Sequence, residues 1–321
     1  METRQAGNRG RLVSRLVAAC DLGKSSAGFV LGSVAPDGRL VVEATERVAH
    51  AGRPFEAFRR WYVERDVARC AVLAATGVYG ARLAGPVVRY PEDACREATL
   101  ERDATLPVGL NLLSLGAHGY GVLTRRPAAG GARTRFQDCD KCSSGAGENI
   151  ERMASRFGVT SEEADAAALA ARGSVPVTAR CSVFAKSEMT HYANEGRPAG
   201  DLFRGYFESV ARNACALLAR NRVDGPVLVA GGCTRIGSLV GAIERVLGEP
   251  VRPVGEPLLL EALGAAVLAA GAVEERRAPL PAEPGALVRE PAARFGAHRP
   301  AREWSGRVTR LAAAAPRPDA L

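Results

Sequence analysis

Residues 16–34 read LVAACDLGKSSAGFVLGSV, and this stretch carries the first fold signal of the chain. Two apolar runs flank a short polar turn, which predicts a strand, a tight turn and a second strand. Asp21 ends the first run, where a carboxylate and the amides of a Gly/Ser turn can hold a phosphate and its Mg²⁺. The residues selected at this turn are Asp21, Gly23, Lys24, Ser25 and Ser26. An ordinary hairpin with a capping Asp is the alternative.

A second stretch repeats this plan. Residues 109–124 read GLNLLSLGAHGYGVLT, again a strand, a Gly-rich turn and a strand, which indicates two similar lobes. Residues 226–233 read PVLVAGGC, a buried strand that runs into a double glycine. The turns with Gly116, Gly231 and Gly232 are expected to meet in a cleft between the lobes. A phosphate-bearing ligand is expected in that cleft.

A cysteine stands before a third turn, in residues 136–154, which read FQDCDKCSSGAGENIERMA. Cys142 directly precedes small residues that open a predicted helix. The free N–H groups of a first helical turn favour an anion. Such a position lowers the pKa of a thiol and suits a thiolate, or an anionic cluster held by thiolates. A plain Gly-rich turn with a buried Cys is the alternative.

The chain has eight cysteines. Cys139 and Cys142 form a CxxC, a spacing typical of a redox pair or of half a zinc site, although no second CxxC is present. Of the others, Cys20, Cys70, Cys215 and Cys233 are expected to pack in strands or helices, and Cys95 is expected either to lie on a helix surface or to pack.

Composition excludes some classes of protein. The chain has 321 residues, 47% of them hydrophobic, and a net charge of +8. Residues 1–16 hold four Arg and one Glu, and residues 275–321 hold nine Arg and five acids, so the ends carry seven of the eight charges. The body is close to neutral, and nucleic-acid binding is not expected. Neither a signal peptide nor a membrane-spanning apolar run is recognisable, so we expect a cytoplasmic protein.

Five segments resemble the BadF/BadG/BcrA/BcrD-type ATPases, which activate 2-hydroxyacyl-CoA dehydratases or form the ATPase subunits of benzoyl-CoA reductase. This family lies within the acetate kinase, sugar kinase, Hsp70 and actin superfamily. The two cysteine segments are the most specific part of the resemblance. The five are the turn at Asp21, residues 140–147 (DKCSSGAG), residues 180–188 (RCSVFAKSE), residues 229–232 (VAGG), and Pro257 with residues 261–266 (EALGAA).

The resemblance implies an α/β fold of two ribonuclease-H-like lobes with a nucleotide cleft between them. The lobes are expected over residues 17–107 and 108–273, the second with the cysteine segments. Residues 1–16 are expected to be a disordered arm, and residues 274–321 a disordered Pro/Ala/Arg-rich tail. Gly145 and Gly147 join the expected nucleotide-binding residues, which are otherwise those of the first turn, Gly116, Gly231 and Gly232.

The resemblance also implies a metal centre. Each subunit of a homodimer would give two cysteines, here Cys142 and Cys181, to one 4Fe–4S cluster. Such a cluster needs about four thiolates, and a two-fold axis would supply the second pair.

The implied activity is electron transfer driven by ATP and Mg²⁺. A ferredoxin or flavodoxin would reduce the cluster, which would pass a low-potential electron to a partner 2-hydroxyacyl-CoA dehydratase or benzoyl-CoA reductase-like enzyme.

The chain departs from the family at its second phosphate turn. The family has Asp and then Gly-Gly-Gln-Asp there, whereas residues 114–119 read SLGAHG. His118 could replace a missing catalytic carboxylate beside Asp21, or could be a hydrogen-bonded loop residue. Lys24, where the family usually has Ser, could bind a phosphate or remain solvated. Two other functions stay open: a small-molecule, sugar-type kinase and a nucleotide-binding regulator without hydrolysis.

Overall fold

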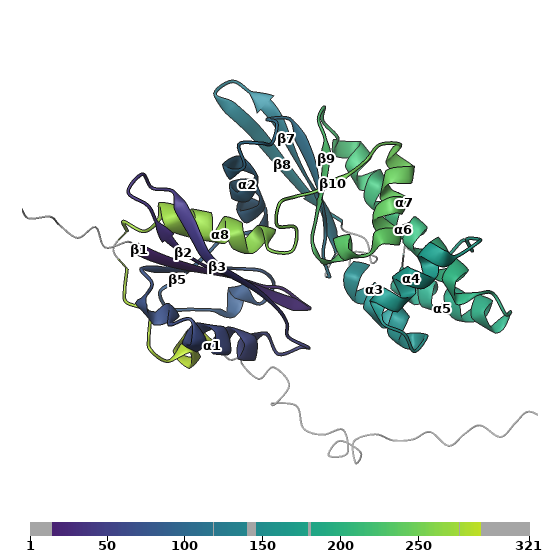
Figure 1. Cartoon of the computed structure of the whole chain (residues 1–321), viewed down its shortest axis with the longest axis horizontal. Coiled ribbons are helices and arrows are strands. Elements are labelled where there is room, and N and C mark those ends of the chain that lie inside the picture. The colour runs from purple at the N-terminus through teal and green to yellow at the C-terminus, as the bar shows by residue number, and fades with distance from the viewer. Residues whose placement is uncertain (1–14, 118, 140–145, 179–180, 276, 290–321) are drawn as a thin grey trace, which may run out of the picture. The chain divides into compact units, whose positions relative to one another are not determined.

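The computed structural model describes residues 15–117, 119–139, 146–178, 181–275 and 277–289. They form two five-stranded mixed sheets with helices packed on them (Figure 1). The first sheet has the order β3-β2-β1-β4-β5, and the second has the order β10-β9-β6-β7-β8. The two-lobed α/β fold predicted from the sequence is confirmed.

The central strand of the first sheet is buried on both faces. Ala18 and Cys20 pack toward α1, whereas Val17 and Ala19 pack toward α8. Successive side chains point to opposite faces, so a strand covered on both sides reads as a continuous apolar run. The elements of this lobe are β1 (Arg15–Leu22), β2 (Ser26–Val34), β3 (Leu40–Ala49), α1 (Pro54–Glu64), β4 (Val72–Thr76), β5 (Val87–Arg89), α2 (Glu92–Arg102) and α8 (Leu260–Gly271).

Helix α8 belongs to the first sheet, although the sequence placed it in the second lobe. Its alanines pack against Val17, Ala19 and Ala74. Gly264 lets α8 approach α2 closely, because a Cβ there would lie 1.8 Å from the carbonyl oxygen of Cys95. The boundary near residue 273 is therefore corrected: the chain returns to the first lobe because the open face of that sheet needs an apolar cover.

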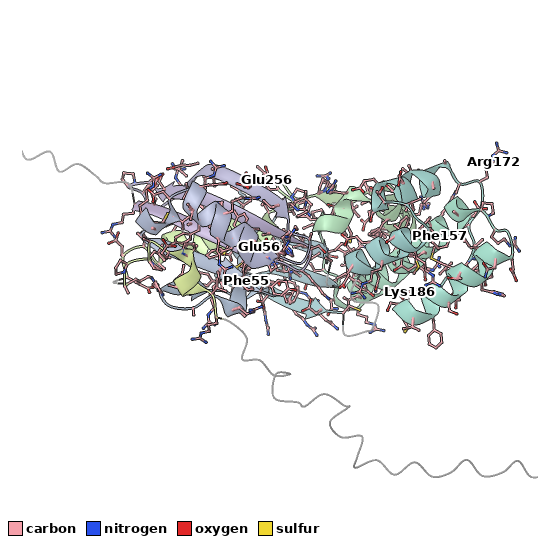
Figure 2. All side chains as sticks on the ribbon, turned by 90° about the horizontal axis from the view of Figure 1, so that it is seen from below. Phe55, Glu56, Phe157, Arg172, Lys186 and Glu256 are labelled. Carbon is pink, nitrogen blue, oxygen red and sulfur yellow. The ribbon has the colours of Figure 1, made fainter. Side chains whose placement is uncertain are left out.

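The second sheet is built around β6, which is antiparallel to β7 and parallel to β9. Its helices form a cluster on one face. In this cluster Phe157, which is labelled in Figure 2, makes an edge contact with Phe203, with 5.2 Å between the ring centroids. The elements are β6 (Leu110–Leu115), β7 (Tyr120–Ala128), β8 (Gly131–Asp138), α3 (Ala146–Arg156), α4 (Ser161–Ala170), α5 (Ser182–Asn194), α6 (Ala199–Asn221), β9 (Val227–Ala230), α7 (Gly237–Leu247) and β10 (Arg252–Pro253).

The start of the expected disordered tail is folded. Leu280 and Leu287 are buried against the core of the first lobe. The Tyr62 hydroxyl donates to the carbonyl of Pro281 (2.7 Å), and the Ala84 N–H group donates to that of Leu287 (2.8 Å). The two leucines and these two hydrogen bonds together hold the segment to the first lobe. Residues 1–14 and 290–321, expected in the arm and the tail, lie outside the described residues.

Buried cysteines account for most of the thiols, as predicted: Cys20, Cys70, Cys95, Cys215 and Cys233. In the part of the chain that the structure describes, no helix has the length and apolar character needed to cross a membrane.

Candidate functional site

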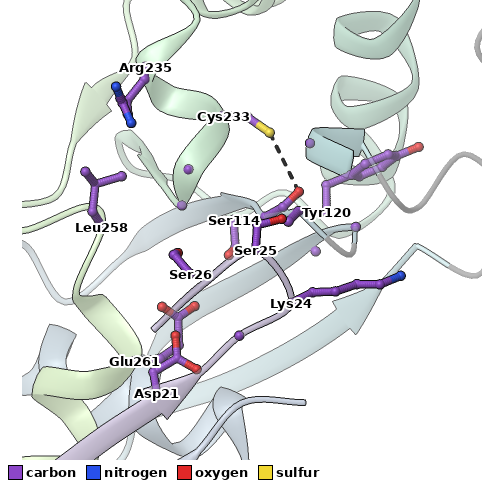
Figure 3. A pocket seen from close by; sticks show the side chains of 18 of the residues that line it. Asp21, Lys24, Ser25, Ser26, Ser114, Tyr120, Cys233, Arg235, Leu258 and Glu261 are labelled. Atoms are coloured by element: carbon purple, nitrogen blue, oxygen red, sulfur yellow. Dashed lines mark hydrogen bonds between the residues drawn. The ribbon is translucent and has the colours of Figure 1, made fainter. Parts of the chain in front are cut away.

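A cavity of about 850 Å³ lies where the turns of the two lobes face each other (Figure 3). It brings together most of the residues selected from the sequence: Asp21, Gly23, Lys24, Ser25, Ser26, Gly116, Gly147, Gly231 and Gly232. Two further selected residues, His118 and Gly145, lie outside the described residues. A volume of this size accommodates a nucleotide-sized ligand.

The first turn is held in place by a histidine that no motif pointed to. His50 follows β3, and its Nε2 lies 3.0 Å from the carbonyl oxygen of Gly23. Its Nδ1 accepts the N–H group of Gly52 (3.2 Å), so Nε2 carries the proton and donates to Gly23. The backbone N–H of His50 also donates to the carbonyl of Ser25 (3.3 Å). These bonds fix the direction of the turn's remaining amides, and only the fold brings His50 to them.

Asp21, the last residue but one of β1, lines this cavity. Burial, and then the carboxylates of Glu261 and Glu92, raise the pKa of Asp21 well above its ordinary value. Space for its carboxylate exists because residue 77 is Gly: a Cβ there would lie 2.2 Å from Oδ1 of Asp21. Gly77 also has a φ of +84°, a conformation that favours glycine.

Sequence reasoning missed a charged group beside Asp21. Arg96 of α2 donates from Nε to Glu261 and from Nη2 to Glu92, both at 2.7 Å. Its guanidinium also lies 4.9 Å from the ring centre of Phe136. Burial alone would lower the pKa of Arg96, but Glu261 and Glu92 outweigh it and raise the pKa. One guanidinium therefore faces three carboxylates, and the cavity keeps an excess of negative charge.

The donor chemistry at this point fits Mg²⁺. Asp21 and Glu261 lie side by side (Figure 3). Mg²⁺ is usually held by one or two carboxylates together with substrate phosphates and water. Within the described ranges, no group of three or more His, Cys, Asp or Glu side chains is placed to bind a metal by itself. A cation here would need the phosphates of a ligand.

The second turn already uses amides that we expected to face an anion. The N–H groups of Gly147 and Glu148, in the first turn of α3, donate to the carbonyls of Gly116 and Ala117, both at 3.1 Å. A Cβ on residue 147 would lie 2.8 Å from Cα of Ala117. Gly147 thus packs α3 onto the turn, and the expectation of a fully free helix start there is corrected.

The double glycine forms the third wall. Gly231 has a φ of +93°, and a Cβ there would lie 2.4 Å from the carbonyl oxygen of Leu115. Nη2 of Arg47, on β3, comes within 3.8 Å of a Cβ placed on Gly232. Burial, and then Arg235, lower the pKa of Arg47 against the attraction of Glu151 and Asp21. Arg47 is a second cavity residue that the sequence did not reveal, because β3 carries no recognisable pattern around it.

Cys181 lies outside the cavity, at the N-cap of α5. The cysteine is half-buried, and no side chain caps this helix start. The next two apolar side chains, Val183 and Phe184, are 68% and 65% exposed. Cys142, selected as the second metal ligand, lies outside the described residues.

The fold of the chain, two five-stranded sheets around a cleft, is that of two solved dehydratase activators. Its structure is similar to the activator of 2-hydroxyisocaproyl-CoA dehydratase from Clostridium difficile with bound ADPNP, at a TM-score of 0.66 and 22% identity over 81% of this chain and 96% of that one. It is also similar to component A of the (R)-2-hydroxyglutaryl-CoA dehydratase of Acidaminococcus fermentans, at a TM-score of 0.67 and 23% identity over 82% of this chain and 100% of that one.

Residues 117–269 match the model of the BadF/BadG/BcrA/BcrD ATPase family, which confirms the resemblance. The activator of lactoyl-CoA dehydratase from Anaerotignum propionicum is 29% identical over 53% of this chain and 65% of its own length. The (R)-2-hydroxyglutaryl-CoA dehydratase activating ATPase of Acidaminococcus fermentans is 32% identical over 43% of this chain and 54% of its own length. The matching segments thus span about half to two thirds of the length of these relatives.

Proposed function

We propose that this protein is an ATP-dependent iron–sulfur activator that passes a low-potential electron to a partner 2-hydroxyacyl-CoA dehydratase or acyl-CoA reductase. The observation that carries the proposal is the combination, in one chain of this family, of a nucleotide-sized cavity and a cysteine at an uncapped helix start. The proposal includes a homodimer and an electron donor of the ferredoxin or flavodoxin class.

The cavity supports the nucleotide half of this proposal. The turn of residues 23–26 would bind phosphates through backbone amides that His50 holds in position. Asp21 and Glu261 would hold Mg²⁺ with those phosphates. Arg96 keeps Glu261 in place and offsets part of the negative charge. Glu261 of α8 would thus supply the carboxylate that the second turn lacks.

The start of α5 supports the iron–sulfur half. A cysteine at a helix N-terminus is favoured as a thiolate, because the first-turn N–H groups stabilise negative charge. Cys181 is at such a position, and exposed Val183 and Phe184 beside it suit a contact that excludes water. When bound, a 4Fe–4S cluster would supply one-electron transfer. Of the two proposed ligands, the structure describes Cys181, and the position of its thiol at a helix start fits such a cluster.

Cys181→Ala is expected to abolish iron binding, because a cluster shared by two chains would lose two of its about four thiolates at once. The measurement is iron content and visible absorption after anaerobic purification or reconstitution. The matched control is Cys139→Ser, which removes a different half-buried thiol, the one that forms the CxxC with Cys142. Iron retained in Cys181→Ala would contradict the proposal, whereas metal lost only in Cys139→Ser would favour the CxxC alternative.

Phe184→Asp is expected to convert a dimer to a monomer, because it places a charge at the centre of the apolar surface beside Cys181. The measurement is molar mass by light scattering after gel filtration. Val246→Asp on α7 is a suitable control, since Val246 is 46% exposed in the same lobe. A dimer that survives Phe184→Asp, or dissociates equally in Val246→Asp, would exclude α5 as the interface.

A nucleotide-binding regulator is the second candidate. It is favoured by the second turn, where Ser114 and Gly116 line the cavity without a carboxylate. A regulator would bind ATP and leave it intact, whereas an activator would hydrolyse it in the presence of its partner enzyme. Measuring phosphate release with and without a dehydratase distinguishes the two.

A further inference from the structure

An ion pair joins the two phosphate turns across the cavity. Nζ of Lys24, in the first turn, lies 2.5 Å from Oε2 of Glu148 on α3. The side chains are 35% and 19% exposed, so the pair is partly screened from water. Glu148 is fixed to the second turn, because its N–H group donates to Ala117. The pair therefore lies between the two turns to which phosphates would bind.

A second pair of opposite charges follows one helical turn along α3. Glu151 lines the same cavity and attracts the half-buried guanidinium of Arg47. In the described part of the chain, no carboxylate lies within ion-pair distance of Arg47, and Arg235 repels it. A half-buried cation with a like-charged neighbour is stabilised by an anion between them. The cavity wall next to it is the double glycine, to which a phosphate could approach closely.

We propose that Glu148 and Glu151 compete with the nucleotide phosphates for Lys24 and Arg47, so that ATP draws both cations away from α3. This inference rests on the proposed nucleotide site and adds Arg47 to it as a phosphate-binding residue. In the absence of nucleotide, the carboxylates of Glu148 and Glu151 offset the positive charges of Lys24 and Arg47, as the phosphates would when bound. With ATP bound, Glu148 loses its ion pair with Lys24, and Glu151 loses the attraction of Arg47.

The exchange is favoured by the charges on both sides. A polyphosphate concentrates more negative charge near Lys24 than one carboxylate does. Glu148 does not become isolated, because Arg152 pairs with it from the next turn of α3. The competition should be strongest for ATP and weakest for AMP, which lacks the outer phosphates.

The test is the affinity of the purified protein for Mg-ATP and AMP, measured by calorimetry. Glu148→Gln should bind ATP about twofold to fivefold more tightly than the wild-type protein, the scale of one partly exposed ion pair. AMP affinity should barely change. Arg47→Gln should weaken ATP binding more than AMP binding. Asp93→Asn is the matched control, since Asp93 is an exposed carboxylate of the same cavity that contacts neither Lys24 nor Arg47.

The double variant Lys24→Met/Glu148→Gln separates competition from a general loss of negative charge. If the two side chains compete as proposed, Glu148→Gln tightens ATP binding only while Lys24 is present, and the effects are not additive. Equal tightening in Asp93→Asn, or in the Lys24→Met background, would overturn the inference and leave the nucleotide site intact. A wild-type protein that binds no ATP would contradict the proposed function as well.

Discussion

Asp21→Asn is expected to abolish ATP hydrolysis and at the same time to stabilise the folded protein. Turnover should fall by at least about a hundredfold, because a carboxylate that holds Mg²⁺ and orients phosphates contributes several kcal/mol to the transition state. The free energy of unfolding should rise by about 1 kcal/mol at neutral pH, a typical gain when a functional site is relieved of an unfavourable charge. That charge is unfavourable because Asp21 is partly removed from water and lies close to the carboxylates of Glu261 and Glu92.

The stability gain should depend on pH in a defined direction. The pKa of Asp21 is raised in the folded protein relative to its ordinary value of 3.8. Wild-type stability is therefore greatest when Asp21 is protonated, and it falls as the pH rises above 3.8 toward the folded pKa. Asn mimics the protonated acid, so the two proteins should be equally stable at low pH and should diverge above it.

Urea unfolding of both proteins at several pH values, together with phosphate release, measures these effects. Asp93→Asn serves again as the control and should leave stability unchanged, because this exposed carboxylate lies outside the group around Arg96. A loss of stability in Asp21→Asn would show that the carboxylate is compensated in the folded state. Unchanged hydrolysis would remove Asp21 from the catalytic machinery.

Gly264→Ala is expected to destabilise the first lobe by about 3 kcal/mol, the upper range for overpacking a buried contact. The added Cβ would lie 1.8 Å from the carbonyl oxygen of Cys95, which is backbone and has no rotamer to adopt. Helix α8 would have to move away from α2. That shift would also separate Glu261 from Arg96, so nucleotide affinity should fall together with stability.

The same helix offers a matched control. Gly271 is the last residue of α8, and no atom lies within 4 Å of the Cβ that Gly271→Ala would add. Ala favours helix over Gly, so this variant should be neutral or stabilised by up to about 1 kcal/mol. Chemical denaturation of the two variants is the measurement. Similar stability of both would show that α2 and α8 are free to separate, and that their close approach is not a constraint of the fold.

Local sequence determined the parts of the site that depend on a few consecutive residues. The turn at Asp21, the second turn at Gly116 and the double glycine line one cavity as predicted. These are positions where strand patterning and glycine act within a few residues, so the chemistry can be read directly from the chain. The cysteine predicted to precede a helix, Cys142, lies outside the described residues, whereas Cys181, for which no helix start was predicted, immediately precedes α5.

Only the tertiary structure decided which distant side chains complete the site. The contacts that bring His50, Arg96 and Arg47 to the site have no local signal. His50 contacts Gly23, 27 residues away, and Arg96 contacts Glu261, 165 residues away, whereas the charges that act on Arg47 lie across the cavity. Helix α8 shows the same limit. Its sequence predicts a helix, but the choice of the first lobe depends on which sheet face remains open and on the fit of Gly264 against Cys95.

The sequence by itself thus determined the two-lobed fold, the family resemblance and the glycine turns around Asp21. The tertiary structure decided the charge balance of the cavity, because burial and long-range pairing set which carboxylates remain uncompensated. It also decided that Lys24 contacts Glu148. Short-range patterns fix backbone geometry, whereas the energy of a charge depends on everything that surrounds it, and that environment exists only once the chain has folded.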